Sequence, residues 1–126
     1  MTQRPWRILV VEDEAIIARD IAMQLQALGY TVLGPAASGE QALALAAGMQ
    51  PDLVLMDVHL AGAMDGISAA QVLRDNYGLP SLFLSAFDGP DSLQRAKLCE
   101  PAGFLVKPFE SYELRDALNS ALKPRA

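Results

Sequence analysis

Short apolar runs separated by longer helical segments are the feature that most constrains the fold of this chain. Three of the predicted strands, Arg7–Val11, Leu53–Met56 and Pro80–Leu84, are apolar on consecutive residues over most of their length. Because successive side chains of a strand point to opposite faces of a sheet, both faces of these strands must be covered. The pattern predicts a parallel sheet buried between two layers of helices.

Five strands and five helices alternate along the chain. A helix is predicted where apolar residues recur every three or four positions, as from Ile17 to Leu28, with Gly29 as its C-terminal cap. This alternation predicts an α/β fold with a doubly wound, five-stranded parallel sheet flanked by helices. The remaining predicted strands are Tyr30–Leu33, which Gly34-Pro35 ends, and Phe104–Val106. The predicted helices are Glu14–Leu28, a helix from Ser38 that ends before Gly48, Asp65–Tyr77, Pro90–Leu98 and Glu110–Leu122.

Size, charge and cysteine content narrow the class of protein. A chain of 126 residues predicts one domain over residues 1–126, with a core of about residues 7–122. The net charge of −5 argues against direct binding of nucleic acid. The longest apolar stretch, Ala42–Met49, is too short to cross a membrane, and the early acids Glu12-Asp13-Glu14 argue against a signal peptide. A single cysteine, Cys99, leaves no internal disulfide and favours a reducing cytoplasm.

Polar side chains follow four of the five predicted strands. Glu12 and Asp13 follow the first strand, Asp57 the third, Ser85 the fourth and Lys107 the fifth. In an open α/β sheet the carboxyl ends of the strands lie at one edge, where ligands bind. A single acid after a strand is more often a helix cap, and a single lysine there is more often a loop residue. Their conjunction at four strand ends indicates a functional site.

The three carboxylates at this edge need positive charge. Two like charges about 4 Å apart repel by roughly 4 kcal/mol at an effective dielectric constant near 20. Lys107 supplies only one positive charge. Oxygen ligands without thiols or paired imidazoles favour Mg²⁺, with Mn²⁺ as the alternative, over zinc. The sequence therefore predicts a site for a divalent cation at this edge of the sheet.

Five segments of the chain resemble the receiver domain of two-component response regulators. The resemblance extends over nearly the whole chain and implies a flavodoxin-like (βα)5 fold with strand order 2-1-3-4-5. Acid pair, lone acid, hydroxyl and Lys-Pro occur in the order and spacing of that family. The segments are Ile8–Glu14, Asp52–Asp57, Met64–Ile67, Pro80–Ala86 and Gly103–Phe109.

The resemblance implies a role for each residue at the edge. Asp57 would accept a phosphoryl group from a histidine kinase or a histidine phosphotransfer protein. Lys107 and Ser85 would assist by holding the phosphoryl oxygens. Such a receiver promotes its own phosphorylation and dephosphorylation, so we do not expect a conventional turnover enzyme. The implied Mg²⁺ ligands are Glu12, Asp13, Asp57 and the main-chain carbonyl of His59.

The resemblance also implies a switch. Ser85 and Phe104 would change position when Asp57 is phosphorylated, and the surface of the last two helices and the strand between them would change with them. That surface would signal to a downstream protein partner or output domain, and a homodimer through it is also compatible with the resemblance. Three features depart from the usual family pattern: Glu12 in place of aspartate, a longer loop over Val58–Gly66, and Phe104 in place of tyrosine.

Two other functions compete with this interpretation. The first is a receiver-like interaction module that no longer undergoes phosphotransfer, against which Asp57, Lys107 and Ser85 argue. The second is a small flavodoxin-like enzyme or nucleotide-binding protein. That protein would need a glycine-rich turn after the first strand, where Glu12-Asp13-Glu14 stands instead.

Overall fold

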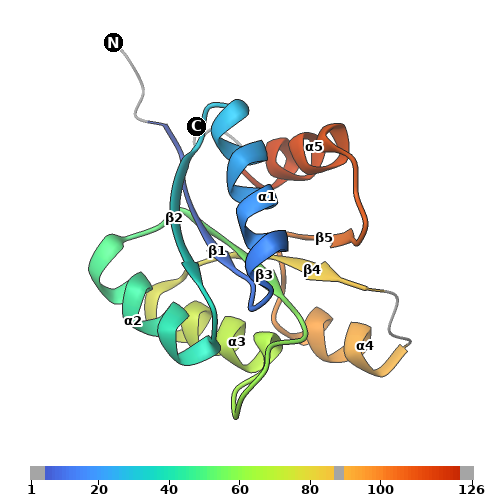
Figure 1. Cartoon of the computed structure of the whole chain (residues 1–126). Helices are drawn as coiled ribbons and strands as arrows, with labels where there is room; N and C mark the ends of the chain where they lie inside the picture. The colour runs from blue at the N-terminus through green and yellow to red at the C-terminus, as the bar shows by residue number, and fades with distance from the viewer. Residues whose placement is uncertain (1–4, 87–89, 123–126) are drawn as a thin grey trace.

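The computed structural model describes residues 5–86 and 90–122, and in the fourth helix the side chains from residue 94 onward. Strands and helices alternate along the chain (Figure 1). None of the helices, over the described residues, is long and apolar enough to cross a membrane. The strands are β1 (Arg7–Val11), β2 (Thr31–Ala36), β3 (Leu53–Asp57), β4 (Ser81–Ser85) and β5 (Gly103–Val106). The helices are α1 (Ala15–Ala27), α2 (Gly39–Met49), α3 (Gly66–Tyr77), α4 (Pro90–Leu98) and α5 (Ser111–Ala121).

The five strands form one parallel sheet in the order β2-β1-β3-β4-β5. Helices α1 and α5 cover one face of the sheet, and α2, α3 and α4 cover the other (Figure 1). The predicted α/β class, the doubly wound sheet and the flavodoxin-like strand order are confirmed. Every parallel strand therefore presents its carboxyl end at the same edge of the sheet.

The three central strands have both faces buried, as their consecutive apolar residues predict. In β1 the side chains of Ile8 and Val10 join the core on the α1–α5 side, whereas Leu9 and Val11 join the core on the opposite side. All four side chains are fully buried. This two-sided burial fixes the register of the strands, because a slip of one residue would exchange the two cores.

Strand β2 is longer than the sequence pattern predicts. The prediction that Gly34-Pro35 ends this strand at Leu33 is wrong, since β2 continues through both residues to Ala36. A proline is tolerated here because β2 is an edge strand, where a missing N–H donor costs little. The pairing with β1 shifts register between Leu9 and Val11, which accommodates the irregular segment as a bulge.

Helix ends follow the predicted signals with one exception. Ser38 caps α2 by accepting a hydrogen bond from the Gln41 N–H at 3.1 Å. Gly29 follows the end of α1 with a φ of +94°, as expected for a glycine that terminates a helix. The prediction that α2 ends before Gly48 is wrong, because α2 runs to Met49. The left-handed residue that ends α2 is Gln50 (φ +52°), so Gly48 lies within the last turn.

Candidate functional site

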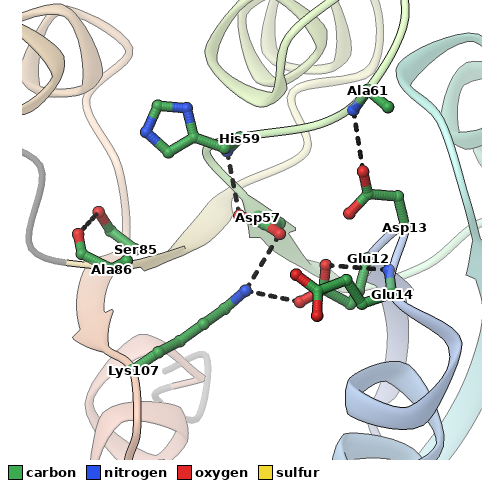
Figure 2. Close-up of polar contacts among 9 residues, drawn as sticks. All are labelled: Glu12, Asp13, Glu14, Asp57, His59, Ala61, Ser85, Ala86 and Lys107. Atoms are coloured by element: carbon green, nitrogen blue, oxygen red, sulfur yellow. Dashed lines mark hydrogen bonds and ion pairs between the residues drawn. The ribbon is translucent and has the colours of Figure 1, made fainter.

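The carboxyl ends of β1, β3 and β5 bring two acids and one lysine into direct contact (Figure 2). The Lys107 Nζ lies 2.6 Å from Glu12 Oε1 and 3.0 Å from Asp57 Oδ2. Strand β4 separates β5 from β3 in the sheet, so the long Lys107 side chain spans the end of β4 to reach Asp57. The strand order therefore explains why the residue after β5 has a long, flexible and positively charged side chain.

These three side chains are largely removed from water. The Glu12 side chain is 0% exposed, Asp57 7% and Lys107 18%. Burial, together with the neighbouring Asp57, raises the pKa of Glu12 above its ordinary value, although Lys107 opposes the change. Burial lowers the pKa of Lys107, but its bonds to Glu12 and Asp57 outweigh burial and leave that pKa above its ordinary value. The lysine is therefore a charged group that two buried acids share.

Asp13 completes a cluster of three carboxylates. One carboxylate oxygen from each of Glu12, Asp13 and Asp57 lies within 4.8 Å of the other two. Asp13 is partly exposed, and its Oδ2 accepts a hydrogen bond of 2.9 Å from the Ala61 N–H. The three possible ligands are all carboxylates, two of them are buried, and a single lysine cannot neutralise them. Such an oxygen-only set fits a hard divalent cation such as Mg²⁺.

The loop after β3 contacts the cluster through its backbone. The His59 N–H donates a hydrogen bond of 3.0 Å to Asp57 Oδ1, while the exposed His59 ring extends away from the carboxylates (Figure 2). The next backbone contact of this loop is the one from Ala61 to Asp13. Both contacts use main-chain donors, so neither could be recognised from residue types in the sequence.

Ser85 is the last residue of β4, and Phe104 lies within β5. The Ser85 Oγ donates a hydrogen bond of 2.6 Å to the Ala86 carbonyl and is turned away from Asp57 (Figure 2). The Phe104 ring packs against Phe83, with ring centroids 5.8 Å apart. The Phe104 side chain thus belongs to the core on the α2–α3–α4 side of the sheet.

Helix α3 begins directly against the backbone of Asp57. A Cβ atom on Gly66 would lie 1.8 Å from the Asp57 carbonyl oxygen, so only glycine fits at this position. The Gly66 N–H also donates to the Val58 carbonyl at 3.1 Å. Asp65 caps the helix by accepting a hydrogen bond of 2.8 Å from the Ser68 N–H. Asp65 was predicted as the first residue of this helix and not as its cap, although aspartate is a usual capping residue.

Comparison with known proteins identifies close relatives along almost the whole chain. The sequence model of the response regulator receiver domain matches residues 8–119. The transcriptional regulatory protein PdtaR of Mycobacterium tuberculosis is 39% identical over 118 residues, which cover 94% of this chain and 57% of that protein. The chain spans about half the length of the curated relatives it matches.

Solved structures resemble the whole fold. The signal receiver domain of a modulated diguanylate cyclase from Desulfovibrio desulfuricans superposes with a TM-score of 0.88 at 36% identity, covering 94% of each chain. The chemotaxis protein CheY4 of Vibrio cholerae superposes with a TM-score of 0.86 at 31% identity, covering 94% of this chain and all of that one. Sequence and structure comparisons thus agree on one family.

Proposed function

This chain belongs to the response regulator receiver domain family, and we propose that it is a phosphorylatable switch whose acceptor is Asp57. The phosphoryl donor would be a phosphohistidine on a histidine kinase or on a histidine phosphotransfer protein. The observation that carries the proposal is the lysine shared between Glu12 and Asp57 beside the third acid, Asp13. Burying these charges costs desolvation energy, which favours a use for them in phosphotransfer over a module that no longer undergoes it.

The proposed transfer uses Asp57 as nucleophile. A carboxylate oxygen of Asp57 forms a bond to phosphorus while the bond between phosphorus and the histidine nitrogen of the donor breaks. The transferred group spreads its negative charge over its equatorial oxygens, so positioning and charge neutralisation provide most of the catalysis. Lys107 already lies 3.0 Å from Asp57, where its ammonium group can follow the charge onto a phosphoryl oxygen.

Mg²⁺, or Mn²⁺ in its place, fits the remaining negative charge. Glu12, Asp13 and Asp57 would hold the ion, and we include the main-chain carbonyl of His59 among the ligands. When bound, the ion would neutralise charge on the phosphoryl oxygens. The Ala61 N–H that now bonds Asp13 keeps one carboxylate oriented at the edge of this site.

The proposed signal runs through β4 and β5. To reach a phosphoryl group on Asp57, the Ser85 hydroxyl must leave the Ala86 carbonyl, and Phe104 must then repack beside Phe83. The resulting change would reach the surface formed by α4, β5 and α5. Exposed apolar side chains on all three elements support a protein partner or output domain there, or a second copy of this chain. They are Leu98, Val106 and Tyr112, which are 81%, 57% and 57% exposed. The proposed location is the cytoplasm.

Acetyl phosphate provides a direct test of the proposal. We expect incubation with acetyl phosphate and Mg²⁺ to add one phosphoryl group to the intact mass, and removal of the metal with a chelator to prevent the gain. Asp57→Asn should abolish the adduct, because the amide is a poor nucleophile. The matched control is Asp75→Asn, which changes an exposed acid of α3 that bonds Gln71. An unmodified wild-type chain would instead support the interaction module without phosphotransfer.

A further inference from the structure

Helix α4 and the residue that follows it, Cys99, are attached to the start of α3 by two described polar contacts. Ala96 and Cys99 are buried on the side that faces the core. The Cys99 thiol donates to the Ile67 carbonyl at 3.6 Å. Arg95 Nη2 forms an ion pair with Asp65 Oδ2 at 3.1 Å. The ion pair is the only one of these contacts that involves a residue of the loop after Asp57.

The Asp65 carboxylate serves two helices at once. Its Oδ1 accepts the Ser68 N–H that caps α3, and its Oδ2 pairs with Arg95 of α4. Burial alone would raise the pKa of Asp65, but the Ser68 bonds and the Arg95 charge outweigh burial and lower it. The cap fixes the position of the carboxylate, so the side-chain entropy lost on pairing comes mainly from Arg95.

Asp65 is also joined to the phosphoacceptor through the backbone. Its neighbour Gly66 lies against the Asp57 carbonyl and donates its N–H to Val58. The loop between them is held at His59, which donates to Asp57 Oδ1. These contacts connect Asp57 by a short, held stretch of backbone to the Asp65 carboxylate, which is the group that Arg95 binds.

We propose that Asp65 and Arg95 are positioning residues that couple the loop after Asp57, residues 58–65, to helix α4. This inference rests on the proposed function for its biological use, because α4 belongs to the proposed signalling surface. The link provides a route from Asp57 to α4 that does not pass through Ser85 or Phe104. Coupling between two sites is reciprocal. A substitution at Arg95 should therefore change the local stability of the loop, and a substitution at Asp65 should change the local stability of α4.

A second ion pair between the same parts of the fold provides a matched control. Arg74 in the last turn of α3 lies 2.7 Å from the Glu100 carboxylate, just beyond α4. This pair has the same chemistry as Asp65–Arg95, but it lies at the opposite end of α3 from Asp57. Breaking it should loosen the end of α4 without affecting the loop.

Amide hydrogen exchange of the unmodified protein tests the coupling. Asp65→Asn keeps a capping side chain but removes the charge, and Arg95→Gln removes the charge of the partner. We expect Arg95→Gln to accelerate exchange at the Ala61 and Gly66 amides by roughly two- to fivefold, the range expected for an exposed ion pair. Asp65→Asn should accelerate exchange at the Cys99 and Glu100 amides by a similar factor.

The double variant and the control decide the outcome. If the two residues act as one link, Asp65→Asn with Arg95→Gln should exchange no faster than either single variant at these amides. Arg74→Gln should leave the Ala61 and Gly66 amides unchanged. Unchanged loop exchange in Arg95→Gln, or fully additive effects in the double variant, would overturn the coupling. These measurements need no phosphorylation, so the absence of an acetyl phosphate adduct would remove the proposed function and leave this result standing.

Discussion

Helices α4 and α5 flank β5 from opposite faces of the sheet, yet they are anchored in different ways (Figure 1). Helix α5 buries Leu114 and Leu118 completely. Among the described side chains of α4 and the residue after it, those that are buried are the small ones of Ala96 and Cys99. Each fully buried leucine contributes about 1.5–3 kcal/mol, whereas an alanine contributes far less. The described part of α4, from residue 94 onward, therefore buries less apolar surface than α5 does.

The ends of the two helices repeat the contrast. Helix α5 begins with a capping box in which the Glu110 and Glu113 side chains each accept a backbone N–H of the other residue. The described polar contacts of α4 include the partly exposed ion pair of Arg95 with Asp65. A cap acts within one helix, whereas an exposed ion pair joins two elements that can separate. From residue 94 onward, α4 is thus held by smaller buried side chains and an ion pair, whereas α5 is held by buried leucines and a capping box.

Truncating one anchor on each helix should give the largest difference. Leu118→Ala in α5 should lower the free energy of unfolding by about 2–5 kcal/mol, because it empties a fully buried position. Ala96→Gly in α4 should lower it by only about 1 kcal/mol, mainly through helix propensity. Urea unfolding followed by circular dichroism measures both values. Equal losses from the two variants would contradict the proposed contrast between the helices.

A buried hydroxyl on the α4 side should give a smaller effect of opposite sign. Ser81 is 5% exposed, and its Oγ has no hydrogen-bond partner among the described residues. Side chains alternate along β4, so Ser81 faces the same side as Phe83, which belongs to the α2–α3–α4 core. Ser81→Ala should therefore raise the free energy of unfolding, by up to about 1 kcal/mol. A loss of stability in urea unfolding would show that the hydroxyl is satisfied in solution.

The local pattern of apolar residues in the sequence was sufficient to predict most of the fold. Consecutive apolar residues in β1, β3 and β4 predicted two-sided burial, and the α4 bounds Pro90–Leu98 agree with the structure. The errors fell at Gly34-Pro35 and Gly48, where a residue that usually ends an element lies within one. At the first of these positions, the edge location of β2 removes the penalty for proline, and edge location is a property of the whole sheet.

The site was predictable where strand ends determine it and not where the loop does. Glu12 and Asp13 follow β1 directly and Asp57 ends β3, so the parallel sheet alone brings them together. The backbone donor of Ala61 and the contact of Gly66 with Asp57 depend on the path of the loop, which residue types do not specify. The pairing of Asp65 with a residue of α4 depends likewise on how two helices pack. The roles of Ser85 and Phe104 stay predictions.

The smallest expected effect concerns the pH dependence of the α4 attachment. The pKa of Asp65 lies below its ordinary value of 3.8, since the Ser68 bonds and Arg95 outweigh burial. A lowered pKa means that Asp65 stabilises the folded chain fully above pH 3.8, and that this contribution disappears as the pH falls through the folded-state pKa. Arg95→Gln should raise the Asp65 pKa in a carboxyl NMR titration, whereas Arg74→Gln should not.

The same titration predicts how stability differs between the variants. At pH 6 the free energy of unfolding of wild type should exceed that of Arg95→Gln by a few tenths of a kcal/mol, as is typical of exposed ion pairs. This difference in stability should narrow toward pH 3. The narrowing follows because protonated Asp65 no longer attracts Arg95, while its cap on Ser68 is common to both proteins. A gap that stayed constant or widened at low pH would mean that Arg95 stabilises α4 by packing and not by charge. In that case α4 would lack an electrostatic attachment to the loop after Asp57.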